Sequence, residues 1–209
     1  MRVIDPYFVI ESEIDACKIL LNIEKIARVS YKSEEKMTEQ PNKKFLKMLI
    51  EKEHLSVFEH EYISVRFICD RGVSHEIVRH RIGSYTQEST RYCNYFKDKF
   101  GKSITFIKPF FFKEGSLEYD IWYNTMQEIE KAYFKLIELG RTPQEARAVL
   151  PNSLKTEIIV TYNLRSWRHF FQLRCDKRAH PQMRQLAIPL LEEFKKRLPI
   201  VFDDLDYNL

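Results

Sequence analysis

Arginine, histidine and hydroxyl side chains are concentrated in residues 79–92, which read Arg-His-Arg-Ile-Gly-Ser-Tyr-Thr-Gln-Glu-Ser-Thr-Arg-Tyr. A guanidinium stays charged in any protein and needs an anion, a carboxylate or water as its partner. Arg79, Arg81 and Arg91 therefore indicate either a solvated basic surface or a site for an anionic ligand. The polar loop expected over residues 84–89 favours a ligand, because hydroxyls flanked by arginines can hold a phosphate through charge-assisted hydrogen bonds.

The same stretch begins on an expected helix, residues 74–82. Glu76, Arg79 and His80 would then lie on one helical face, at positions i, i+3 and i+4. A solvated surface helix with a Glu76–Arg79 pair explains this triplet without any ligand. Both interpretations stay open on local grounds, and the adjoining polar loop favours the site.

Metal binding and nucleophilic catalysis have weaker support. His75 and His80 are five residues apart, whereas a zinc-protease helix places its two histidines four apart, so we expect no metal. Ser89 is not in a Gly-x-Ser-x-Gly turn, and the sequence places no histidine–aspartate pair beside it. A ligand-binding hydroxyl is the better interpretation of Ser89.

Glycine content limits how a nucleotide could be bound. The chain has five glycines, and they do not form a glycine-rich loop. Folds that bind phosphates through backbone amides need clustered glycines. Any nucleotide must therefore be held by side chains.

Hydrophobic periodicity predicts an α+β fold, with a small central sheet and several helices, in a single domain over residues 1–209. Strands are expected at residues 61–69, 103–108 and 154–162. The first would bury one face, made of Ile63, Val65, Phe67 and Cys69. Helices are expected at residues 12–30, 42–53, 74–82, 117–139, 166–173 and 181–198, with a short one after Thr142.

Local signals set several of these boundaries. Gly72 is expected to break the chain, and Ser74 to cap the helix that follows. Gly140 should end the long helix, and Pro189 should kink the last one.

Composition points to a cytoplasmic protein that does not bind nucleic acid or membranes as its main task. The net charge of +4 among 209 residues is only mildly basic. No apolar run reaches membrane-spanning length, and the first residues lack a signal-peptide core. The four scattered cysteines are expected to be reduced, buried thiols.

The pattern of the 79–92 stretch resembles the signature of the flavin-dependent thymidylate synthases. Six positions carry the match: Arg79, His80, Arg81, Ser84, Ser89 and Arg91. The resemblance implies reductive methylation of dUMP to dTMP, with FAD as cofactor and with NADPH and 5,10-methylenetetrahydrofolate as co-substrates. It also implies a homotetramer whose active sites form between subunits.

Three further segments resemble the same family, so the match runs in order from His54 to Arg174. Residues 54–60 resemble its His-x-Ser/Thr-x-x-Glu-His pattern. Arg147 precedes a Leu-Pro pair, and residues 163–174 resemble its Asn-x-Arg-Ser…Leu-Arg segment. Four residues differ from the commoner family choices: Glu76, Thr86, Gln87 and His169.

The resemblance assigns roles residue by residue. Catalytic roles fall on Arg174, placed against the uracil, and on His54. Cofactor contacts are expected from Ser56, Arg79, His80, Arg81, Gln87, Asn163, Leu164, Arg165 and His169. Contacts with dUMP are expected from Glu76, Arg79, Gln87, Glu88, Ser89, Thr90, Arg91, Arg147 and Arg174.

Two functions of other classes remain as alternatives. Arginines near Tyr85, Tyr92, Tyr95 and Trp167 could stack and hold the bases of a nucleic acid, although acidic residues interleave with the basic ones. A helical interaction protein is the third possibility, and it predicts that Arg79 and Arg174 are dispensable.

Overall fold

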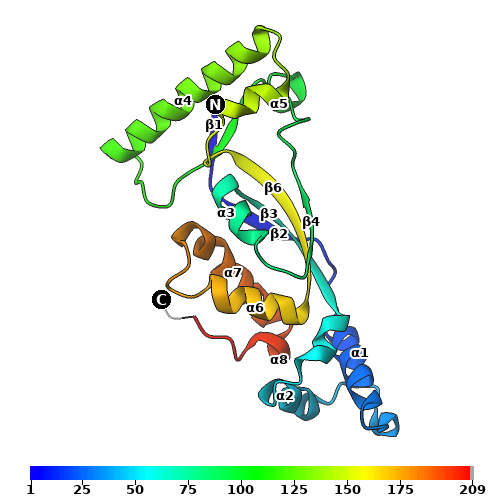
Figure 1. Cartoon of the computed structure of the whole chain (residues 1–209). Coiled ribbons are helices and arrows are strands. Elements are labelled where there is room, and N and C mark those ends of the chain that lie inside the picture. The colour runs from blue at the N-terminus through cyan, green and yellow to red at the C-terminus, as the bar shows by residue number, and fades with distance from the viewer. Residues whose placement is uncertain (208–209) are drawn as a thin grey trace. The chain divides into compact units, whose positions relative to one another are not determined.

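The computed structural model describes residues 1–207 (Figure 1). It describes every side chain in that range except that of Lys99. The helices are α1 (Ala16–Val29), α2 (Lys43–Glu51), α3 (Arg71–Ile77), α4 (Leu117–Glu138), α5 (Pro143–Ala146), α6 (Leu164–Arg174), α7 (Pro181–Arg197) and α8 (Pro199–Phe202). The strands are β1 (Arg2–Ile4), β2 (Tyr7–Ile10), β3 (Tyr62–Asp70), β4 (Ser84–Gln87), β5 (Thr105–Ile107) and β6 (Lys155–Asn163). Short 3-10 helices are η1 (Glu34–Lys36), η2 (Leu55–His60), η3 (Asp98–Phe100) and η4 (Arg147–Val149).

The strands form two sheets. One has the order β2-β3-β6-β4. The other pairs β1 in parallel with β5, with Val3 opposite Phe106. The long strands β3 and β6 are neighbours at the centre of the larger sheet. Because the sheets are small and the helices many, the structure is α+β, as the periodicity predicts.

The chain divides into two compact units, each assembled from separate segments. Unit 1 comprises Met1–Tyr7, Phe67–Arg79 and Thr86–Ile159. Unit 2 comprises Phe8–Arg66, His80–Tyr85 and the segment from Val160 onward.

Each unit has its own apolar core. The core of unit 1 gathers around α4, and its buried residues are Tyr95, Ile104, Phe106, Trp122, Met126, Tyr133, Ala146 and Leu154. The core of unit 2 is an aromatic cluster on α6, α7 and α8, with Trp167 stacked on Phe171 at 5.7 Å between ring centroids. Phe194 packs edge-on against Phe171 at 5.2 Å. Aromatic packing of this kind fixes the orientation of α6, whose two ends carry candidate site residues.

Most expected elements are confirmed. β3 buries Ile63, Val65, Phe67 and Cys69, as its alternation predicts. The long helix α4 ends just before Gly140, which has a positive φ of 84° that favours glycine. Pro189 lies inside α7, and Cys69 and Cys175 are buried. Cys17, in contrast, is exposed.

The boundaries expected for residues 74–82 are wrong. α3 begins at Arg71, because the carboxylate of Asp70 accepts a hydrogen bond from the amide of Val73 at 2.8 Å and so caps the helix. Ser74 lies inside α3, and its hydroxyl donates to the carbonyl of Arg71 instead. Gly72 is therefore a helical residue and does not break the chain.

α3 also ends earlier than expected, at Ile77. Arg79 and His80 follow it in a turn, so the helical face shared with Glu76 does not exist. Residues 84–87, expected as a loop, form β4. This strand is polar because it lies at the edge of its sheet, where an apolar face is not required.

Candidate functional site

A hydrogen bond joins Arg174 to His80 in unit 2. Arg174 ends α6, and its Nε donates to Nε2 of His80 at 2.8 Å. A guanidinium can only donate, so Nε2 is unprotonated and the imidazole proton is on Nδ1. Burial, helped by the charges of Arg174 and His169, lowers the pKa of His80 to about 4. His80 is therefore neutral at pH 7, and it holds the guanidinium through an acceptor atom.

Aromatic side chains fix the position of His80. The ring of Phe170 lies 5.0 Å from that of His80, between centroids. The hydroxyl of Tyr85 donates to the backbone carbonyl of His80, and it lies 2.9 Å from the hydroxyl of Tyr162. The segment from His80 to Tyr85 is thus anchored on β6.

A cavity of about 420 Å³ opens beside the first turn of α6 in unit 2. Its lining residues are Leu55, Glu59, Arg81, Ile82, Asn163, Arg165, Ser166, Arg168, His169 and Gln172. The side chain of Asn163 caps α6 by accepting from the amide of Ser166 at 2.8 Å. The helix dipole and the nearby guanidinium groups make this cavity attractive to an anion.

Charges inside this cavity are partly compensated by the protein. Nη1 of Arg165 lies 2.6 Å from a carboxylate oxygen of Glu59, and both residues line the cavity. Arg81 and His169 are exposed. The structure thus brings together Arg81, Asn163, Arg165 and His169, four of the residues expected to contact the cofactor. Leu164 is fully buried, so it can reach a ligand only through its backbone.

In unit 1 the side chain of Gln87 is held by other residues of the protein. Its amide nitrogen donates to the hydroxyl of Ser74 at 2.9 Å and to that of Thr156 at 3.1 Å. These bonds connect β4 to α3 and β6. The amide group therefore fixes the strand that leads into the Ser89–Arg91 turn.

The turn itself places donors near the surface of unit 1. The carbonyl of Ser89 accepts from the amides of Tyr92 and Cys93, at 3.2 and 2.9 Å. Thr90 is buried, and its hydroxyl accepts from Nη1 of Arg147 at 3.3 Å. Arg91 is exposed, with its guanidinium 5.5 Å from the ring of Tyr92. Residues 89–91 and Arg147 thus form one basic, hydroxyl-bearing surface.

A second, smaller cavity adjoins this surface in unit 1. It has a volume of about 260 Å³, and Arg71, His75, Thr90 and Arg147 are among its lining residues. The sequence-based prediction missed Arg71 and His75. They lie at i and i+4 on α3, so recognising Asp70 as the N-cap would have placed both on one helical face.

The other predicted site residues are absent from the linings of these two cavities, as far as residues 1–207 are described. His54 and Ser56 are exposed at the start of η2, in the same turn as the cavity residues Leu55 and Glu59. Glu76 and Arg79 belong to unit 1, where Arg79 is exposed. Residues 1–207 contain no cluster of three or more histidine, cysteine, aspartate or glutamate side chains suited to a metal ion.

Comparison with known proteins identifies the family. The model of the thymidylate synthase complementing proteins matches residues 15–200. The chain belongs to this family. Flavin-dependent thymidylate synthases of Pyrococcus furiosus and Geobacter sulfurreducens are 38% and 36% identical to it, over 80% and 81% of the chain and 68% and 72% of their own lengths. That of Thermosipho melanesiensis is 34% identical over 88% of the chain and 85% of its own length.

The fold of this flavin-dependent thymidylate synthase family member is also found in a solved structure. The UMP/dUMP methylase PolB from Streptomyces cacaoi, crystallised with 5-Br dUMP, is similar with a TM-score of 0.78. The alignment covers 97% of this chain and 96% of PolB, at 20% identity. This similarity supports the α+β architecture. The family assignment does not support the nucleic-acid-binding alternative.

The side chains of the α6 cavity suit the flavin cofactor that the family implies. Arg81 and Arg165 supply guanidinium donors, and the start of α6 supplies the positive end of a helix dipole. This donor set matches a pyrophosphate, which a glycine-poor chain must bind through side chains.

In the described part of the chain, no helix is both long and apolar enough to cross a bilayer.

Proposed function

We propose that the protein methylates dUMP to dTMP, with 5,10-methylenetetrahydrofolate as the carbon donor and FAD, reduced by NADPH, as the hydride source. The observation that carries this proposal is the cavity beside α6, where Arg81, Arg165 and the helix N-terminus meet. Membership of the flavin-dependent thymidylate synthase family supports it. The fold of the nucleotide methylase PolB is consistent with it.

In this proposal the surface of the Ser89–Arg91 turn binds dUMP through its phosphate. Arg91 and Arg147 supply positive charge, and Ser89 and Thr90 supply hydroxyls. Binding the phosphate fixes the position of the pyrimidine ring, which lowers the entropic part of the barrier. Glu76 and Arg79, of the same unit, would make the other contacts with the nucleotide.

Arg174 is proposed to contact the uracil ring. C5 of uracil is a weak nucleophile, and it becomes more reactive when negative charge on the N3 and O2 side is stabilised. The guanidinium of Arg174 supplies that stabilisation, and neutral His80 keeps it in position without competing for its charge.

The cofactor is proposed to bind along the α6 cavity. Arg81, Arg165, Asn163 and His169 hold its phosphates and ribityl chain, with a backbone contact from Leu164. Bound FAD supplies the redox chemistry that the side chains lack. The remaining cofactor contacts proposed are Ser56, Arg79, His80 and Gln87, and His54 would lie near the flavin and the folate.

The active form is proposed to be a cytoplasmic homotetramer of single-domain subunits, with sites shared between subunits. Large apolar side chains beside the proposed ligand residues support such contacts: Ile82 is 82% exposed and Tyr92 is 77% exposed. Neighbouring subunits would cover them and would also enclose the cofactor.

An absorbance spectrum of the purified protein, recorded before and after adding dUMP, tests the proposal. A flavin spectrum that changes with dUMP is expected, because the proposed reaction brings the nucleotide to the flavin. A colourless protein that neither takes up added FAD nor responds to dUMP would overturn it. Turnover is then measured as dTMP formed from dUMP, NADPH and methylenetetrahydrofolate.

A further inference from the structure

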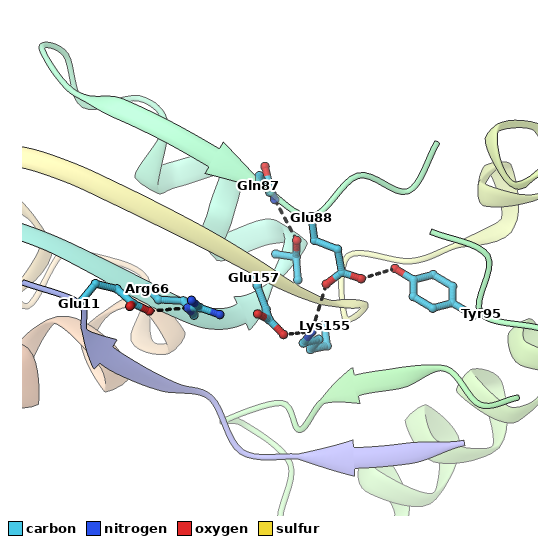
Figure 2. Close-up of polar contacts among 8 residues, drawn as sticks. Glu11, Arg66, Gln87, Glu88, Tyr95, Lys155 and Glu157 are labelled. Atoms are coloured by element: carbon cyan, nitrogen blue, oxygen red, sulfur yellow. Dashed lines mark hydrogen bonds and ion pairs between the residues drawn. The ribbon is translucent and has the colours of Figure 1, made fainter. Parts of the chain in front are cut away.

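The carboxylate of Glu88 is bound on both oxygens by other residues of unit 1. The hydroxyl of Tyr95 donates to Oε1 at 3.0 Å, and Nζ of Lys155 lies 3.0 Å from Oε2 (Figure 2). Lys155 also bonds the carboxylate of Glu157. The backbone amide of Glu88 donates to the carbonyl of Glu157 at 2.9 Å. Backbone and side chain of Glu88 are therefore both fixed on β6.

The two partners of Glu88 are themselves firmly placed. Tyr95 is only 5% exposed, and its ring packs on Tyr133 of α4 at 5.7 Å between centroids. Burial, reinforced by the Glu88 charge, raises the pKa of Tyr95 far above its usual range, so its hydroxyl always has a proton to donate. The side chain of Lys155 is 20% exposed.

Lys155 stays charged despite this partial burial. Desolvation acts to lower its pKa, but hydrogen bonds with Glu157 and Glu88 outweigh it and raise the pKa. The Glu88 side chain is 14% exposed, and the charge of Lys155 balances that of its carboxylate. A charge-assisted bond on each oxygen is among the stronger polar contacts in proteins.

These contacts lie immediately before the basic turn of residues 89–91. Ser89 follows Glu88 directly, and the turn closes at Cys93, two residues before Tyr95. The interactions of Glu88 with Tyr95 and Lys155 therefore tie down the two ends of the turn, on opposite sides of Ser89 and Arg91.

We propose that Tyr95 and Lys155 are positioning residues, which act through Glu88 to hold the Ser89–Arg91 turn in the conformation that binds the nucleotide phosphate. Glu88 then serves the site without touching the nucleotide. This inference rests on the proposed function, and it replaces the substrate contact that the family resemblance suggests for Glu88. Preorganising the turn raises affinity, because the cost of ordering it is met during folding.

The test compares four variants with the wild-type protein loaded with FAD. Tyr95→Phe removes one hydroxyl, Lys155→Met removes the charge, Lys155→Arg keeps it, and Glu88→Gln keeps the shape of the carboxylate. Titration calorimetry gives the Kd for dUMP, and steady-state kinetics give KM and kcat. We expect Tyr95→Phe, Lys155→Met and Glu88→Gln each to raise Kd and KM about three- to tenfold, with kcat and FAD content nearly unchanged. Lys155→Arg should restore most of the affinity.

A double variant and a control sharpen the test. The double variant Tyr95→Phe with Glu88→Gln should lose less binding free energy for dUMP than the sum of the two single variants, because both substitutions remove one interaction. Lys131→Met removes an exposed lysine of α4 that pairs with Glu128 of the same helix at 2.7 Å, and it should leave Kd unchanged.

Three outcomes separate the possibilities. If Glu88→Gln weakens dUMP binding while Tyr95→Phe and Lys155→Met do not, Glu88 is a direct ligand and the inference is wrong. If Tyr95→Phe unfolds at a much lower temperature, the Kd values of Lys155→Met and Lys155→Arg for dUMP decide whether the inference holds. If the wild-type protein binds no dUMP at all, the proposed function itself has failed.

Discussion

Arg174 and His80 are 94 positions apart in the sequence, and a 2.8 Å hydrogen bond from Nε to Nε2 joins them. The bond fixes the protonation state of the imidazole, since a guanidinium offers only donors. It also fixes the direction of the guanidinium at the end of α6. Two residues of the proposed site therefore depend on each other for their geometry.

The stability of the protein should fall at acidic pH because of His80. Its folded-state pKa is lowered from 6.5 to about 4, so in this range the unfolded chain binds a proton that the folded chain does not. Stability from this residue is fully present above pH 6.5 and is lost as the pH falls toward 4, by up to about 3 kcal/mol. Urea unfolding at pH 7.5 and 4 measures the loss. In His80→Gln, which cannot titrate, the pH dependence should be smaller by that contribution, and an equal dependence would contradict the assignment.

Arg174→Ala should abolish dTMP formation while the protein keeps its FAD. The guanidinium is proposed to stabilise charge on the uracil, and loss of such a group typically costs about 100- to 1,000-fold in kcat. Flavin absorbance and dTMP formation are measured on the same sample. Arg178→Ala is the matched control, since this exposed guanidinium pairs locally with Asp176 at 2.9 Å and should be dispensable. Normal turnover by Arg174→Ala would exclude the proposed role.

Gly83→Ala should destabilise unit 2. A Cβ at this position would lie 2.2 Å from a ring carbon of Tyr162, well inside van der Waals contact. Because that ring is buried and its hydroxyl contacts Tyr85, it cannot move aside freely. We expect a loss of about 1–3 kcal/mol, as for other overpacked sites, measured by thermal unfolding. Gly115→Ala tests backbone effects separately: it has open space around its Cβ and a positive φ of 83°.

Two substitutions of Asn163 should separate helix capping from anion binding. Asn163→Ala removes the bond to the amide of Ser166 and should cost about 1 kcal/mol of stability. Asn163→Asp keeps a good cap but adds negative charge to the cavity, so it should keep stability and weaken FAD binding. Unfolding free energies and FAD dissociation constants are compared for both. Unchanged FAD affinity in Asn163→Asp would argue against phosphate binding at the start of α6.

Sequence patterns predicted the helices and long strands well, because each has an apolar face with a regular period. The family signature also grouped Arg81, Asn163, Arg165 and His169, which line one cavity in the structure. The polar strand β4 could not be recognised in this way. It owes its structure to backbone pairing with β6 and to the hydrogen bond of Gln87 with Thr156, which is 69 positions away in the sequence.

Capping was the other source of error. Asp70 and Ser74 are both good N-cap residues, and the choice between them depends on where β3 ends. Since β3 continues to Asp70, the helix starts directly after it. Residues that act on a site through another residue, as Tyr95 is proposed to act through Glu88, have no signal in the sequence. Such contacts arise only when α4 and β6 have folded against the turn.

The chain alternates between the two compact units at residues 7–8, 66–67, 79–80, 85–86 and 159–160. A single break in the chain therefore cannot separate the two units, and neither unit is encoded by a continuous stretch of the gene. A nonsense mutation before residue 160 would truncate both units at once. For this reason the units should be inherited together, and a fragment library of this gene should yield no clone that folds as either unit alone.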